Sequence, residues 1–162
     1  MSTPVSDPYL ALPLDGVRAI EASAGTGKTF TLATLVVRLV VERGLRLGEI
    51  LAVTFTEAAT QELRKRIRAR LLLAVERVDM LPGEEASPEA TLTHAVIAAH
   101  LARGAETIGA LRRRLRTAAD DIDLASIFTI HGFCARVLRE HALESGQGFD
   151  APALLASDAE LR

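Results

Sequence analysis

The sequence predicts an α/β fold in which a parallel sheet is flanked by helices. Three short apolar runs, at 17–22, 49–56 and 125–130, alternate with longer segments whose apolar residues recur at helical spacing. Strand–helix–strand order predicts parallel strands with right-handed crossovers. A glycine-rich loop ending in Gly-Lys-Thr follows the first run directly, and this arrangement is typical of a P-loop NTPase.

Composition and charge narrow the class of protein. With 162 residues, 49% hydrophobic and 25% charged, the chain is expected to form one globular domain. The net charge of −2 gives no overall support to nucleic-acid binding, so local clusters must carry that argument. Cys134 is the single cysteine, which excludes an internal disulfide, and we expect it to face the core. No secretory signal or membrane span is visible, so a cytoplasmic location is expected.

Local signals predict the elements of the first half. The segment 1–16 is Pro-rich and is expected to be irregular, and 17–22 is the first predicted strand. Residues 28–43 have the apolar spacing of a helix, which Gly44 should end. The run 49–56 is mostly apolar and rich in strand formers, as in a strand that is buried on both faces.

The second half is predicted to be mainly helical. A long helix starts at Glu57, and a Pro- and Gly-containing linker follows at 82–88. Residues 89–118 look helical, with a break near Gly104. After the strand at 125–130, a helix is expected over 131–144.

The glycine loop predicts a site for ATP and Mg²⁺. Gly25 and Gly27 can take positive φ angles and turn successive N–H groups toward phosphate oxygens, and the following helix adds its N-terminal donors. Lys28 is expected to reach the β- and γ-phosphates and Thr29 to ligate Mg²⁺, which makes them the predicted catalytic pair. A chance Gly-rich turn is the alternative. The predicted nucleotide-binding residues are Ala22, Ser23, Ala24, Gly25, Thr26, Gly27, Lys28 and Thr29.

Two further strand ends belong with this loop. In parallel sheets, ligands bind at the carboxyl ends of the strands. Phe55 and Thr56 follow the second run, and Thr129 to His131 follow the third. We therefore expect all three segments at one edge of the sheet.

Three motifs resemble those of UvrD-like superfamily 1 helicases. The stretch 22–29 resembles motif I, in which Ala is common at the first position, as at Ala22 here. The stretch 53–67 looks like motif Ia and 128–138 like motif Ib, and together they cover most of 17–145. Within the family the chain looks most like one group of helicase–nuclease subunits. Helicases of AddA or UvrD type are the alternatives.

The resemblance implies an ATP-driven translocase on single-stranded DNA with a RecA-like fold, which unwinds duplex ends in recombination and repair alongside partner subunits. It also implies that Phe55, Thr56, Thr129 and His131 contact DNA. Other roles stay open for these residues. Phe55 could be a buried strand end, Thr56 a helix N-cap and His131 a local hydrogen-bonding residue.

Two basic clusters leave their role open. They could contact DNA phosphates, or they could solvate helix faces beside nearby acids. The first cluster lies after motif Ia and the second lies on a later helix. Their members are Arg64, Lys65, Arg66, Arg68 and Arg70, and then Arg112, Arg113, Arg114 and Arg116.

The resemblance also sets the expected domain limits. We expect an N-terminal segment at 1–16, part of the ATP-binding domain at 17–148 and the start of an accessory subdomain at 149–162. Hydrolysis in this family needs an Asp-Glu pair after a further strand, and no such pair occurs in the sequence. We therefore expect an incomplete domain that binds ATP without hydrolysing it at a helicase rate. A non-catalytic binding module and a small-molecule kinase are the competing hypotheses.

Overall fold

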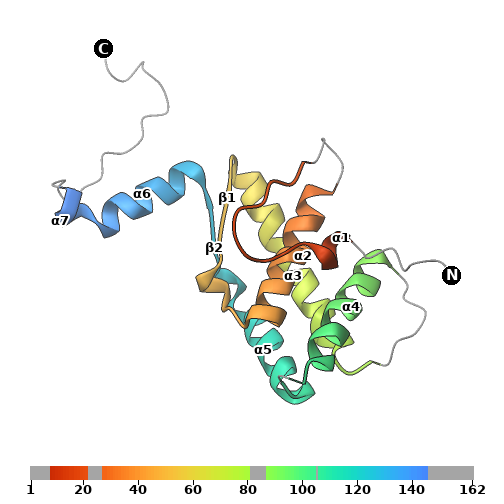
Figure 1. Ribbon diagram of the computed structural model, residues 1–162. Coiled ribbons are helices and arrows are strands. Elements are labelled where there is room, and N and C mark those ends of the chain that lie inside the picture. The colour runs from red at the N-terminus through yellow and green to blue at the C-terminus, as the bar shows by residue number, and fades with distance from the viewer. Residues whose placement is uncertain (1–7, 22–26, 81–86, 105, 146–162) are drawn as a thin grey trace, which may run out of the picture.

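The computed structural model describes residues 8–21, 27–80, 87–104 and 106–145 (Figure 1). It is mostly helical and contains one two-stranded sheet, so the predicted α/β class is confirmed. Within these residues, no helix has the length and apolar character needed to cross a membrane. In chain order the elements are α1 (Pro8–Ala11), α2 (Lys28–Arg43), η1 (Leu47–Glu49), β1 (Leu51–Thr54), α3 (Glu57–Arg77), α4 (Pro88–Ala102), α5 (Ile108–Asp120), η2 (Asp121–Leu124), β2 (Ser126–Thr129), α6 (Ile130–Glu140) and α7 (Ala142–Ser145).

The sheet pairs the second and third predicted strands. β1 and β2 run parallel, with Leu51 opposite Ser126 and Thr54 opposite Thr129. Both strands are shorter than the apolar runs that predicted them. Glu49, at the start of the run 49–56, belongs to η1, and Ile130, at the end of the run 125–130, belongs to α6. The predicted parallel arrangement is confirmed for these two strands.

The prediction of a first strand over 17–22 is wrong for the residues that the structure describes. Residues 17–21 form no strand, and Val17 is 95% exposed. A strand becomes stable when its N–H and C=O groups bond to a neighbouring strand. In the described part of the chain, β1 pairs with β2 alone and no strand lies beside 17–21. Ala22, the last residue of the predicted strand, lies outside the described residues.

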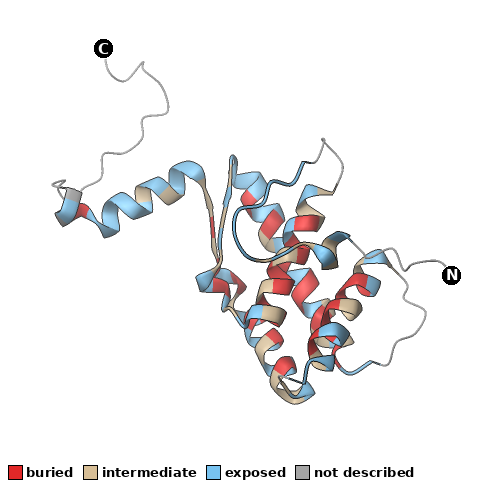
Figure 2. Ribbon diagram, viewed as in Figure 1, coloured by how far each residue is buried: buried red, intermediate tan, exposed pale blue. Residues whose placement is uncertain are grey.

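The prediction that β1 is buried on both faces is also wrong. Leu51 is 50% exposed and Val53 is 43% exposed, while Ala52 and Thr54, which alternate with them along the strand, are half-buried. The Thr54 hydroxyl lies 2.6 Å from that of Thr60 in α3, so the half-buried face is the one toward this helix. Figure 2 shows β1 exposed along much of its length. Described helices cover one side of the sheet and leave the other open.

The core lies among α2, α3, α4 and α5, and α3 packs against the other three. The ribbon segments coloured as buried in Figure 2 gather where these helices meet. The predicted helix over 28–43 is confirmed, and it ends at Gly44, whose φ is +68°. The break near Gly104 is confirmed too, because α4 and α5 are separate helices. The completely buried core residues include Val40, Val41, Leu71, Ala74, Leu111 and Leu115.

The last described helices extend away from this core (Figure 1). α6 has no buried residue, and Cys134 on it is exposed, so the expectation that this cysteine faces the core is wrong. α6 contacts the two strands and α7 rather than the helical core, which leaves most of its surface uncovered in the described structure. The predicted helix over 131–144 is divided at His141 into α6 and α7.

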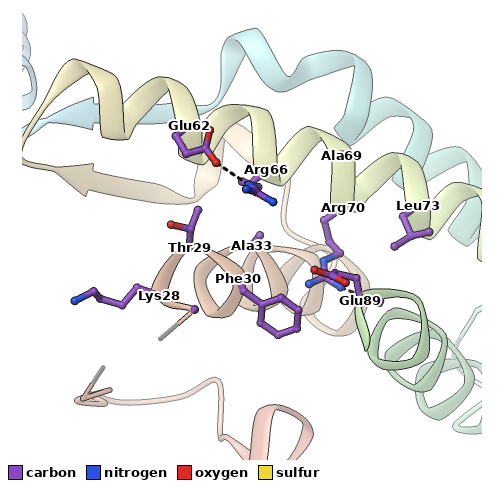
Figure 3. Close-up of a pocket in the computed structure, with 11 residues that line it drawn as sticks. Lys28, Thr29, Phe30, Ala33, Glu62, Arg66, Ala69, Arg70, Leu73 and Glu89 are labelled. Atoms are coloured by element: carbon purple, nitrogen blue, oxygen red, sulfur yellow. Dashed lines mark hydrogen bonds and ion pairs between the residues drawn. The ribbon is translucent and has the colours of Figure 1, made fainter. Parts of the chain in front are cut away.

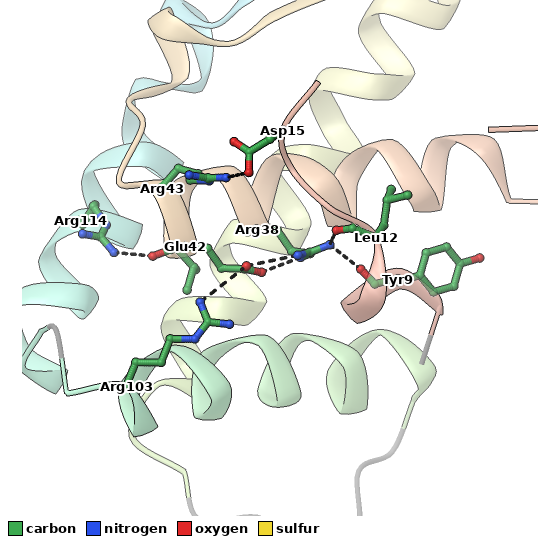
Figure 4. A network of polar contacts seen from close by, with 9 residues as sticks. Tyr9, Leu12, Asp15, Arg38, Glu42, Arg43, Arg103 and Arg114 are labelled. Carbon is green, nitrogen blue, oxygen red and sulfur yellow. Dashed lines mark hydrogen bonds and ion pairs between the residues drawn. The ribbon is translucent and has the colours of Figure 1, made fainter. Parts of the chain in front are cut away.

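The N-terminal segment is fastened to α2 by a buried arginine (Figure 4). Arg38 Nη1 donates hydrogen bonds of 2.7 Å to the carbonyl oxygens of Tyr9 and Leu12, and Arg38 Nε pairs with Glu42 at 2.5 Å. Part of this segment, predicted to be irregular, is the short helix α1. The same contacts hold the chain that leads toward the glycine loop against the body of the molecule.

Candidate functional site

The glycine loop ends where α2 begins. Gly27 occupies the N-cap position with φ +85° and ψ 22°, which confirms the positive φ predicted there. Glycine has no side-chain acceptor, so the N-cap residue makes no side-chain capping hydrogen bond to the N–H groups in the first turn of α2. These donors and the positive end of the helix dipole suit an anionic ligand. Predicted nucleotide-binding residues 22–26, Gly25 among them, lie outside the described residues.

A pocket of about 420 Å³ opens beside this helix start, between α2, α3 and α4 (Figure 3). In the figure, Thr29 lies on the side of α2 that faces α3, while Lys28 points away from α3. The pocket therefore lies between the start of α2 and the stretch of α3 from Glu62 to Leu73. The residues that line the pocket are Gly27, Lys28, Thr29, Phe30, Ala33, Glu62, Arg66, Ala69, Arg70, Leu73 and Glu89.

An ion pair lies on α3 where this helix lines the pocket. Arg66 Nε lies 2.7 Å from Glu62 Oε1, and both side chains are largely exposed. The hydrogen bond from Arg66 lowers the pKa of the Glu62 carboxyl and raises the pKa of the Arg66 guanidinium. A carboxylate thus faces the helix start from across the pocket.

Arg70 is buried at the back of the pocket. Its Nη1 donates to the carbonyl oxygen of Glu89 at 2.7 Å and to the Thr93 hydroxyl at 3.2 Å, and its Nη2 donates to the Thr34 hydroxyl at 3.4 Å. Its guanidinium also lies 4.5 Å from the ring centre of Phe30. Burial lowers the pKa of Arg70, although a guanidinium stays charged in proteins. Arg70 joins three helices and is not part of a surface cluster.

The two strand ends converge as predicted. Because Thr54 pairs with Thr129, the residues that follow β1 and β2 lie at the same edge of the sheet. The Thr56 hydroxyl accepts a hydrogen bond from the Ala59 N–H at 3.1 Å, which confirms it as the N-cap of α3. Thr129 caps α6 in the same way, since its hydroxyl accepts from the Gly132 N–H at 3.0 Å.

Two rings are exposed at this edge. Phe55 is 86% exposed, so the alternative that it is a buried strand end is wrong. His131 is exposed in the first turn of α6, and its ring makes no hydrogen bond within the described part of the chain. Sequence reasoning missed Phe30, which borders the pocket, although its position directly after Lys28 and Thr29 places it in the first turn of α2.

Comparison with known proteins decides the family. Residues 8–160 match the family described as the UvrD/REP helicase N-terminal domain. The chain belongs to the UvrD/REP helicase family. The glycine loop, the α3 start and the α6 start of this UvrD/REP domain are the regions that resemble motifs I, Ia and Ib, so that resemblance is confirmed at the level of the family.

Curated relatives of this UvrD/REP domain are named RecBCD enzyme subunit RecB. The protein of Escherichia coli (strain K12) is 42% identical over 149 residues, which make up 87% of this chain and 12% of that protein. The protein of Haemophilus influenzae is 38% identical over 148 residues, again 87% and 12%. That of Mycobacterium tuberculosis (strain H37Rv) is 45% identical over 130 residues, 79% and 11%. The chain thus spans about an eighth of the length of these relatives.

Proposed function

We propose that the chain is the N-terminal ATP-binding part of a RecB-like DNA helicase and exonuclease subunit. The parent protein would translocate on single-stranded DNA and unwind duplex ends during recombinational double-strand break repair. The observation that carries this proposal is the start of α2, where Gly27 turns the chain at a positive φ and provides no capping side chain, beside a pocket that Gly27, Lys28 and Thr29 line. Family membership and the RecB-named relatives support the rest.

The residues at this helix start suit ATP and Mg²⁺. Backbone N–H groups of the loop and of α2 would bind the phosphates, Lys28 would contact the β- and γ-phosphates, and Thr29 would ligate the metal. Bound Mg²⁺ would neutralise charge on the phosphates. Ala22, Ser23, Ala24, Gly25 and Thr26 complete the proposed cradle.

Lys28 provides the first test. Lys28→Ala should weaken ATP binding by about tenfold or more, since a charge-assisted hydrogen bond contributes about 1.5–3 kcal/mol. Lys65→Ala is the matched control, because Lys65 is exposed on α3 outside the pocket. Titration with a fluorescent ATP analogue measures both, and equal affinities of the two variants would reject the phosphate site.

Thr29→Ala should weaken binding of the ATP analogue when Mg²⁺ is present and leave it unchanged in EDTA.

The strand-end edge is the proposed DNA contact. Phe55 offers an exposed ring to a base, while Thr56, Thr129 and His131 lie beside it to contact the sugar-phosphate backbone. Phe55→Ala should cost about 1–3 kcal/mol of affinity for oligothymidylate. Leu124→Ala is the control, because Leu124 is 72% exposed before β2, at the opposite end of the strand. Unchanged binding by Phe55→Ala would remove the edge from the proposal.

Turnover and partners complete the proposal. The 162-residue chain should bind ATP but show no DNA-stimulated hydrolysis at a helicase rate, because its sequence has no adjacent Asp-Glu pair. A phosphate-release assay with single-stranded DNA measures this, and normal turnover would contradict it.

The proposed partners of the parent protein are single-stranded DNA, duplex ends and RecC- and RecD-like subunits in the cytoplasm, with no membrane partner.

A further inference from the structure

A basic groove runs along α3 next to the nucleotide pocket, and Ala69 borders both. It lies between α3 and η2 and has a volume of about 370 Å³. Its lining carries three basic side chains against one acid, so the groove is net positive. The residues that define this basic groove are Gln61, Arg64, Lys65, Arg68, Leu72 and Asp123.

The structure divides the first basic cluster by role. Arg66 is paired with Glu62, and Arg70 is buried against backbone and hydroxyl oxygens. Lys65 and Arg68 are instead exposed, and neither makes a hydrogen bond or ion pair with the described part of the chain. Their charges therefore stay available to a ligand in the groove.

Arg64 forms the inner wall of the basic groove. Its Nη1 donates to Gln61 Oε1 at 3.3 Å, and its Nη2 donates to the carbonyl oxygen of Ile127 in β2 at 3.4 Å. Its Nε is buried without a hydrogen-bond partner. These contacts hold the guanidinium between α3 and β2, and they leave one donor unsatisfied.

The basic groove continues from the strand-end edge. Gln61, Lys65 and Arg68 lie on one face of α3, because they are four and then three residues apart. α3 begins directly after Phe55 and Thr56, and a rise of about 1.5 Å per residue puts Arg68 about 18 Å along the helix from Thr56. A strand bound at the edge could therefore pass along this line of positive charge.

We propose that the basic groove binds the phosphodiester backbone of single-stranded DNA that continues from the strand-end edge. Lys65 and Arg68 contact successive phosphates, and Arg64 shapes the wall behind them. The proposal rests on the proposed DNA contact at Phe55. Continuity with that edge favours nucleic acid over an acidic protein segment as the occupant.

Two lengths of oligothymidylate test the groove on the 162-residue chain. One of about 4 nucleotides covers the edge alone, and one of about 12 nucleotides also reaches the groove. Lys65→Gln/Arg68→Gln should weaken binding of the longer strand about tenfold and leave the shorter one unchanged. Removing two phosphate contacts should also reduce the salt slope for the longer strand by about 1.4.

The control is Arg46→Gln/Arg103→Gln, which removes two charges from exposed side chains that belong to neither basic cluster and lie outside the basic groove. Circular dichroism checks that both double variants are folded. If the groove variant behaves like this control, the inference is overturned, while the edge proposal stands as long as Phe55→Ala weakens both strands. If Phe55→Ala changes the binding of neither strand, the edge proposal fails. The inference that a bound strand passes from the edge into the groove then fails with it. Equal displacement of the longer strand by polyglutamate and by unlabelled oligothymidylate would reject nucleic acid as the occupant.

Discussion

Arg70 shows how one buried cation can join three helices. Arg70 belongs to α3, and its guanidinium donates hydrogen bonds to oxygens of α2 and α4. The same guanidinium lies over the ring of Phe30. Each acceptor would lose this charged donor if the guanidinium were removed, and the loss of a donor to a buried oxygen is unfavourable. Arg70 lines the pocket but is thus a packing residue.

Removing this cation should destabilise the protein. We expect Arg70→Ala to lower the free energy of unfolding by about 2–3 kcal/mol, through the unsatisfied acceptors and the lost contact with Phe30. Arg68→Ala, two residues earlier and exposed, should change it by less than about 0.5 kcal/mol. Urea unfolding followed by circular dichroism measures both, and similar losses in the two variants would contradict the role assigned to Arg70.

Glu62 should titrate below its ordinary range. Because the hydrogen bond from Arg66 lowers the folded pKa, the pair stabilises the fold above the unfolded pKa, and this contribution is lost as pH falls through the folded pKa. Arg66→Gln should raise the pKa of Glu62, whereas Arg68→Gln should leave it lowered. Carboxyl NMR titration gives the answer, and a pKa that Arg66→Gln does not move would exclude the hydrogen bond as the cause.

α2 differs from the other long helices in the residue at its N-cap. α3, α4, α5 and α6 each begin with a Ser or Thr whose hydroxyl accepts a first-turn N–H. α2 has Gly27 at its N-cap, and glycine has no side chain to accept such a hydrogen bond. The helix that lacks this local stabilisation is the one that follows the glycine loop, where we propose that phosphate oxygens act as acceptors.

Thr56 can be tested for its two roles separately. Thr56→Asp should keep the free energy of unfolding within about 0.5 kcal/mol, because aspartate is a strong N-cap, while Thr56→Ala should lose about 1 kcal/mol. The aspartate should nevertheless weaken oligothymidylate binding, since its carboxylate repels phosphate. Thermal unfolding and fluorescence anisotropy measure the two effects. DNA affinity at the wild-type level in Thr56→Asp would leave this residue with the capping role alone.

At the scale of the whole molecule, stability comes from the helices more than from the sheet. Leu71 on α3 is completely buried among them, while Leu51 on β1 is half exposed. The sheet contributes two short strands with one face uncovered in the described structure. Its main role here is to hold two helix starts at one edge.

Truncating one leucine in each place should show this asymmetry. Leu71→Ala should cost about 2–5 kcal/mol, because it removes buried methyl groups and leaves a cavity. Leu51→Ala should cost less than about 1 kcal/mol, since half of that side chain already contacts water. Denaturant unfolding measures the pair, and a larger loss for Leu51→Ala would mean that the open face of the sheet is covered in solution.

Local signals in the sequence determined the helices and the strand-end motifs. The helix over 28–43, its end at Gly44 and the cap at Thr56 depend on neighbours within a few residues, so they were predictable. Motif spacing was enough to indicate the family that the comparison confirmed. The proposed nucleotide and DNA roles were also predicted from the sequence, and the experiments above test them.

The tertiary structure decided what depends on distant partners. Whether an apolar run becomes a strand depends on what lies beside it, which is why 49–56 contains a strand and 17–21 does not. Whether a basic residue is free depends on the elements packed around it. Five cations looked alike in the sequence. Packing buried Arg70, paired Arg66 with an acid, and placed Arg64 against a carbonyl oxygen of β2. It left Lys65 and Arg68 exposed along the groove.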